Sequence, residues 1–196
     1  SFTEVYIILV SIIQATVFGY LIIKFFDYYY DFTPLRILIF FATFLLIIMV
    51  WNQYMIGSTA LRFKPQLFPD SILIFVLGFT ETLVIFHIFS DLYLWCYSMA
   101  LVTFVSLLTT INGFYNARHF SENDIIFKKL GYWPKLIQIM LFITSIIYII
   151  LGYFSYQYTN IQTIQYVIAS LFLIFTLTYL VGGFKYWAII MNKPNN

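Results

Sequence analysis

Charge is scarce in this sequence. Only 9% of the 196 residues are Asp, Glu, Lys or Arg, whereas 62% are hydrophobic and 22% are aromatic. A soluble domain carries about 25% charged residues, so this chain lacks the side chains that would cover a water-facing surface. Its net charge of +2 is also too small to indicate nucleic-acid binding. We therefore expect a polytopic protein whose surroundings are the lipid bilayer, with no nucleic acid among its partners.

Cysteine and the common catalytic motifs are nearly absent as well. Cys96 is the only cysteine, which excludes an intramolecular disulfide. The sequence has no glycine-rich phosphate loop, no HExxH, no GxSxG and no pair of acids within one apolar run. We predict no catalytic residue, no metal and no cofactor, and an intramembrane enzyme is the least favoured function.

What the chain does have is six long apolar runs. Each is near the roughly 20 residues that a helix needs to cross a hydrocarbon core of about 30 Å. The runs are Val5 to Phe26, Leu35 to Ile56, Ser71 to Ser90, Leu92 to Ile111, Trp133 to Phe154 and Gln162 to Ile190. They are continuous and do not alternate, so helices are the way to satisfy their backbone groups in lipid. The predicted fold is an all-α bundle of six transmembrane helices in a single domain over residues 1–196.

The basic residues divide unevenly between the two ends of such a bundle. The end with both termini would hold eight of them: Arg62, Lys64, Arg118, Lys128, Lys129, Lys135, Lys185 and Lys193. The other end has only Lys24 and Arg36. By the positive-inside rule both termini should be cytoplasmic. The N-terminal SFTE has no basic region, so we interpret the first run as a retained span. The abundance of Ile, Phe, Tyr, Lys and Asn fits an AT-rich bacterial genome, so we expect the membrane to be a bacterial cytoplasmic (inner) membrane.

Two longer connections lie at the basic end. The first, Gly57 to Asp70, combines a glycine with two prolines and is predicted to be ordered but not helical. The second connection is Asn112 to Lys135. In it Ser121 and Asp124 form a weak capping box that opens a helix, and Gly131 ends it, which predicts a short amphipathic helix on the membrane surface. That helix either only links two spans or docks a cytosolic partner or anionic lipid. The residues predicted for such docking are Arg118, Lys128 and Lys129.

Small residues recur at helical spacing in several runs. Such seams let another backbone approach closely. They are Ser11, Ala15 and Gly19 in the first run, Gly78 with Thr82 in the third, and Gln138, Ser145 and Gly152 in the fifth. The seams should face protein, either within one chain or in a homo-oligomer.

One acidic residue lies deep in an apolar run. Glu81 is the eleventh residue of the third run, which places it roughly 16 Å from either end. A charged carboxylate at that depth costs several kcal/mol unless it meets a partner or water. Gln14 lies at a similar depth in the first run. Glu81 is therefore predicted to bond Gln14 between helices, to line an ion or proton path near Thr82, or to face lipid in its protonated form.

A second polar pair ends the same run. His87 and Asp91 are four residues apart, one helical turn, so a hydrogen bond between them is expected. It would be structural or would serve pH sensing. His87 and Glu81 point about 120° apart on the helix, which excludes a direct proton relay.

Two functions follow from these features. In the first, the chain is a subunit, expected to be oligomeric, that forms or contributes to a path for protons, ions or small solutes around Glu81 and Gln14. In the second, it is a membrane anchor or sensor that holds a cytosolic partner, for example in a bacterial stress or phage-defence complex. The small number of intramembrane polar groups favours the second, and the depth of Glu81 favours the first.

Overall fold

The computed structural model describes residues 2–61 and 67–191, and that part of the chain is helical without any strand. The helices in these ranges are α1 Phe2–Asp27, α2 Pro34–Ala60, α3 Leu67–Phe86, α4 Leu92–Ala117, α5 Asp124–Leu130, α6 Trp133–Gln157 and α7 Gln162–Met191. All except α5 are long and apolar enough to cross a membrane, which confirms the six predicted spans. Arg62, Lys64 and Lys193 lie outside the described residues.

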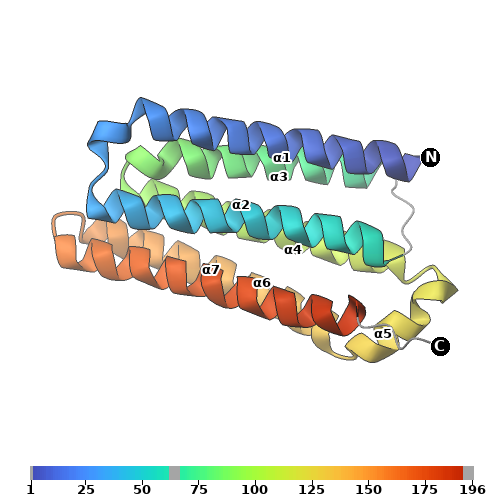
Figure 1. Cartoon of the computed structure of the whole chain (residues 1–196). Coiled ribbons are helices and arrows are strands. Elements are labelled where there is room, and N and C mark those ends of the chain that lie inside the picture. The colour runs from blue at the N-terminus through green and yellow to red at the C-terminus, as the bar shows by residue number, and fades with distance from the viewer. Residues whose placement is uncertain (1, 62–66, 192–196) are drawn as a thin grey trace.

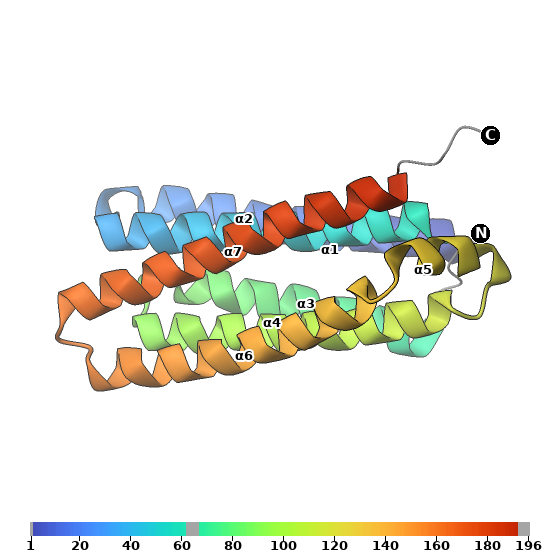
Figure 2. The ribbon, with the colours of Figure 1, turned by 90° about the horizontal axis from the view of Figure 1, so that it is seen from below.

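The six long helices form two layers (Figure 1). One layer contains α1, α2 and α7, and the other contains α3, α4 and α6. Within the layers the closest packing is between α4 and α6, followed by α4 with α3 and α2 with α7. The layers meet chiefly where α1 lies on α3. Figure 2 shows both layers from below, with α7 beside α2 and α6 beside α4.

Both ends of the described chain and α5 lie at one end of the bundle, here called the inner end (Figure 1). The opposite, outer end holds the turns after α1, α3 and α6, including the 3-10 turns Tyr29–Asp31 and His87–Phe89. This follows from six spans, because an even number of crossings returns the chain to its starting side. The side of the membrane on which the inner end lies stays a prediction.

Local sequence explains where several helices begin and end. The Thr33 hydroxyl accepts a 3.3 Å hydrogen bond from the Arg36 backbone N–H, and Pro34 occupies the first turn of α2. Proline suits the first turn because a backbone N–H at that position would have no acceptor within the helix, so its absence costs no hydrogen bond. Pro134 has the same role in α6. Gly131 ends α5 with φ +52°, a left-handed conformation that glycine adopts without a steric cost.

The connection from Gly57 to Asp70 is more helical than the sequence predicts. Helix α2 continues through Gly57 to Ala60, and α3 begins at Leu67, so that Pro69 lies in its first turn. A glycine inside a helix costs only about 1 kcal/mol relative to alanine, and a first-turn proline breaks no hydrogen bond. The prediction that this connection is not helical was therefore wrong for its two ends.

Large side chains fill the outer half of the bundle. The rings of Trp95 and Phe172 lie 4.6 Å apart between centroids, and Tyr148 stacks on Phe172 at 4.1 Å. These three residues tie α4, α7 and α6 together. The Trp95 indole N–H donates to the Thr43 hydroxyl at 3.0 Å, which adds α2 to the same cluster. The two layers are thus joined by packed aromatic rings in this half.

Seams of small residues differ in what they contact. In α6 the Ser145 hydroxyl donates to the Ala100 carbonyl of α4 at 3.0 Å, and a Cβ added at Gly152 would overlap the Tyr97 ring. This seam faces protein, as expected. In α1, by contrast, Ala15 is exposed and a Cβ at Gly19 would meet no atom within 4 Å.

The seam of Ser11, Ala15 and Gly19 therefore does not form a close contact with another helix of this chain. Ser11 is half-buried and its hydroxyl donates to its own helix, at Ile7 O. Helix α1 instead packs through a stripe of larger side chains, because these provide more contact area against α2 and α3. The stripe consists of Tyr6, Val10, Gln14, Val17 and Leu21, all of them buried.

Candidate functional site

Glu81 meets Gln14 in the middle of the bundle. The Gln14 Nε2 donates to Glu81 Oε2 at 2.8 Å. Gln14 is 4% exposed and Glu81 is 0% exposed. Each lies on the buried face of its helix, Gln14 in α1 and Glu81 in α3. The structure thus brings together the two residues that similar depth in the sequence had paired.

A close approach of α1 and α3 makes this contact fit. Gly78 lies nearly one turn before Glu81, and a Cβ added there would overlap the Ile13 side chain, next to Gln14. Without a side chain at position 78, the Ile13 methyl group occupies the space against α3. Gly78 is therefore a packing residue at the Glu81 site, as its predicted seam implied.

Two oxygen atoms of this pair have no hydrogen-bond partner. They are Gln14 Oε1 and Glu81 Oε1, both buried. An ionised carboxylate and an amide oxygen are both acceptors, so neither can satisfy the other. A proton on Glu81 turns one of the two acceptors into a donor and allows the acid and the amide to pair through both of their groups. The surroundings therefore favour the neutral acid over a charge in an apolar interior.

Thr82 does not join the pair. Its hydroxyl donates to the Gly78 carbonyl of its own helix at 2.8 Å. This bond is the usual way in which a threonine is satisfied inside an apolar helix. The predicted grouping of Thr82 with Glu81 and Gln14 is thus not seen as a direct contact.

His87 and Asp91 do not bond each other as expected. Helix α3 ends at Phe86, and His87 to Phe89 form a 3-10 turn, so the four-residue spacing no longer places the two side chains one above the other. His87 Nδ1 instead lies 2.7 Å from the Ser98 hydroxyl of α4. Because that hydroxyl donates to Leu94 O at 3.0 Å, the His87 ring N–H is the donor.

A second buried carboxylate was not predicted from the sequence. Asp70, in the first turn of α3, is 3% exposed and accepts hydrogen bonds from the side-chain amides of Asn112 and Asn116. The two asparagines are four residues apart and so lie on one face of α4. The predicted fourth span ends at Ile111, before both of them, whereas α4 continues to Ala117. The Asn-x-x-x-Asn spacing was the signal that could have predicted this cluster.

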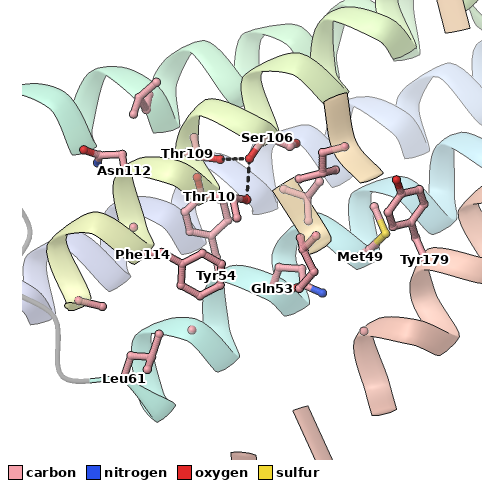
Figure 3. A pocket seen from close by; sticks show the side chains of 18 of the residues that line it. Met49, Gln53, Tyr54, Leu61, Ser106, Thr109, Thr110, Asn112, Phe114 and Tyr179 are labelled. Atoms are coloured by element: carbon pink, nitrogen blue, oxygen red, sulfur yellow. Dashed lines mark hydrogen bonds between the residues drawn. The ribbon is translucent and has the colours of Figure 1, made fainter. Parts of the chain in front are cut away.

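A cavity of about 230 Å³ lies between the two layers in the inner half. Its walls come from all six long helices, and Asp70 with Asn112 forms part of one wall. Figure 3 shows Tyr54, Phe114 and Leu61 around it, with Met49 and Tyr179 at its deeper side. The hydroxyls of Thr109 and Thr110 both donate to Ser106 O, as the dashed lines mark.

The Tyr54 hydroxyl lies within electrostatic range of both buried carboxylates. It is buried, has no hydrogen-bond partner, and lies beside Thr109, whose own hydroxyl is directed to Ser106. Tyr54 also lines the cavity, so it lies between the mid-bundle pair and the inner end.

Helix α5 presents the predicted basic residues. Lys128 and Lys129 are exposed, whereas Leu130 is 1% exposed and packs with Phe114 of α4 and Ile137 of α6. Arg118 lies over the Phe127 ring, 5.5 Å from its centroid, and thereby links the end of α4 to α5. The predicted capping box does not start the helix, because no side-chain hydrogen bond caps it.

By its fold the chain is a multi-pass helical membrane protein with buried polar groups in its interior. Among the described residues, no three His, Cys, Asp or Glu side chains gather as metal ligands would. Comparison with protein families, with curated proteins and with solved structures finds no match for this chain.

Proposed function

We propose that this chain is a subunit of a membrane proton path in which Glu81 takes up and releases a proton. The observation that carries the proposal is the buried Gln14 and Glu81 pair, whose two unpartnered acceptor oxygens one proton would satisfy. An ionisable group at this depth is costly to keep, which is why such groups usually serve a function.

The proposed route runs from the inner end to Glu81 through Tyr54. A tyrosine hydroxyl both donates and accepts, so it can receive a proton from one side while passing its own to the other. Tyr54 lines the cavity in the inner half of the bundle, so a proton that enters this cavity from the inner end can reach the Tyr54 hydroxyl. Beyond Glu81, the rings of Trp95, Phe172 and Tyr148 fill the outer half. Release of the proton from Glu81 to the outer side therefore requires these rings to move apart, as they would in an alternating-access cycle.

Orientation and assembly belong to the same proposal. The inner end, which carries α5 and its exposed lysines, faces the cytoplasm of a bacterial cell. Because Glu81 is 0% exposed and pairs within its own chain, the path runs inside one subunit and not between subunits. A homo-oligomer would then hold several such paths in parallel.

Replacement of Glu81 by Gln tests the proposal. The amide introduced at position 81 can still exchange hydrogen bonds with Gln14, so the bundle should fold, but it can carry no proton. Purified protein in vesicles loaded with a pH-sensitive dye should lose proton flux by at least tenfold. Thr82→Val, one residue away but outside the pair, is the matched control and should keep the flux. Equal fluxes for wild type and Glu81→Gln would remove Glu81 from the path.

A second function is favoured by one separate observation. Lys128 and Lys129 are exposed on a helix whose other face is fixed to the bundle through Leu130. This arrangement presents a rigid basic surface at the inner end. In this alternative the chain is an anchor that docks a cytosolic partner there, and Glu81 with Gln14 only holds α1 to α3.

A further inference from the structure

We infer that the inner cavity is a binding site for an amphiphilic organic cation, a protonated amine attached to an apolar body of about two fused rings. The site is the space between Tyr54, Asp70, Phe114 and the inner halves of α6 and α7. The inference concerns this cavity alone and does not depend on proton transfer at Glu81.

The size of the cavity sets the size of the ligand. An engineered cavity of about 150 Å³ in another protein takes up benzene, and the cavity here has about 230 Å³. Its lining residues on α4 run from Ser106 to Ala117, which lie eleven positions apart, or roughly 16 Å at the helical rise. It is therefore longer than one ring and suits a fused or extended apolar body.

The walls suit an apolar body with a positive charge at one end. Aliphatic side chains, including Leu141 and Ile137, line the deeper and α6 sides. Aromatic rings of Tyr54, Phe114 and Trp133 lie toward the inner end. Such rings attract a cation over their faces, and more strongly when water is excluded. An anion would gain nothing from these rings.

The polar end of the cavity defines the head group. Asp70 is the only charged residue among the lining residues that the structure describes, and the Asn112 and Asn116 amides hold its two oxygens in place. The Tyr54 hydroxyl, buried and without a hydrogen-bond partner, lies within electrostatic reach of Asp70. An ammonium group has three donors, so it can bond the Asp70 carboxylate and the Tyr54 oxygen together.

Depth in the membrane agrees with this orientation. Asp70 is the second residue of its span, which begins at Pro69, so it lies at the level of the membrane surface. An amphiphilic cation in a bilayer keeps its charged group at that level and its apolar body in the hydrocarbon. A ligand that enters from the inner leaflet would then have its amine at Asp70 and its rings between the layers.

The test uses 2-(1-naphthyl)ethylamine, whose intrinsic fluorescence reports binding to the purified full chain in detergent. We expect saturable binding that weakens at least tenfold in Asp70→Asn. The neutral analogue 1-propylnaphthalene should bind wild type at least tenfold more weakly than the amine and should be insensitive to Asp70→Asn. Equal binding of the amine and the neutral analogue would overturn the assignment of a cation site.

A second variant keeps the test decisive if Asp70→Asn does not fold. Gly113 lines the cavity, and a Cβ there meets no atom within 4 Å, so Gly113→Phe places a ring at the cavity wall. Gly19→Phe makes the same change on α1, also in open space, away from the cavity. The amine should lose affinity only in Gly113→Phe. Equal affinity in both variants, or no saturable binding to wild type, would show that the cavity is not the site.

Discussion

The outer and inner halves of the bundle are built from the same kind of apolar helix, yet they pack differently. In the outer half, Trp95, Phe172 and Tyr148 fill the space between the layers. In the inner half a half-open cavity of about 230 Å³ lies between the layers, with Asp70 in its wall. A chain that only anchored a partner would gain stability by filling that space. The difference is consistent with the proposed proton path, in which the interior is reached from the inner end.

The two buried carboxylates show the same contrast. Glu81, in the middle, has one amide donor, and its second oxygen is unpartnered. Asp70, near the inner end, has an amide donor on each oxygen. Hydrogen bonds from donors stabilise an ionised carboxylate, whereas an apolar site with few donors disfavours it. The arrangement therefore suits an ionised carboxylate better at Asp70 than at Glu81.

The largest expected effect comes from opening the outer half. Trp95→Ala removes a ring that is 0% exposed, together with its contact to Phe172 and its hydrogen bond to Thr43. Large-to-small changes of this kind cost about 3 kcal/mol or more, and the lower value applies here because lipid is as apolar as the core. Unfolding by a denaturing detergent should show this loss. In vesicles, Trp95→Ala should also raise passive proton leak.

The control for this change removes only the hydrogen bond. Thr43→Val keeps the shape of the side chain but leaves the Trp95 N–H without its acceptor, which should cost about 1 kcal/mol. Proton leak should stay at the wild-type level. If Trp95→Ala were as stable as Thr43→Val, the outer half would not be the tightly packed region described above.

A smaller effect is expected where α1 meets α3. Gly78→Ala forces a Cβ against Ile13, whose branched side chain has essentially one χ1 rotamer in a helix and cannot turn away. Overpacking costs about 1 to 3 kcal/mol, and the better helix propensity of alanine offsets up to about 1 kcal/mol of this. The net loss should be about 1 kcal/mol, measured by the same unfolding assay.

Gly19→Ala is the matched control, since it makes the same change on α1 where a Cβ meets open space. Its stability should equal that of wild type or exceed it slightly. Equal losses in both variants would mean that α1 and α3 do not approach as closely as described, and the separation of Gln14 from Glu81 would then need revision.

Much of the fold follows from the sequence because lipid allows few alternatives. Continuous apolar runs of about 20 residues must be helices, and this identified all six spans. The ends were less predictable, since Gly57 and Asn112 resemble loop residues and yet lie within helices. Local preferences of about 1 kcal/mol are easily overcome by packing, here by the Asp70 cluster that retains Asn112 in α4.

The site was predicted only where depth alone decides the contact. Gln14 and Glu81 lie at the same level of two neighbouring helices that run in the same direction, so counting residues was enough. His87 could not be assigned correctly, because its partner Ser98 lies on another helix and the local turn is not α-helical. The cavity was also beyond prediction. The cavity depends on the distance between the two layers, which residue spacing within one helix does not determine.

The smallest effect on stability should come from the surface of the inner end. Lys128→Glu combined with Lys129→Glu reverses two exposed charges, so the free energy of unfolding should change by less than about 0.5 kcal/mol. If the chain is an anchor, the double variant should lose co-purification of a cytosolic partner. If the chain is a proton path through Glu81, its proton flux should not change in the double variant. Lys135→Glu, also exposed but on α6, is the control and should retain the partner. Loss of proton flux in the double variant with the bundle still folded would instead connect α5 to the inner cavity, and the two proposed functions would then share one end of the molecule.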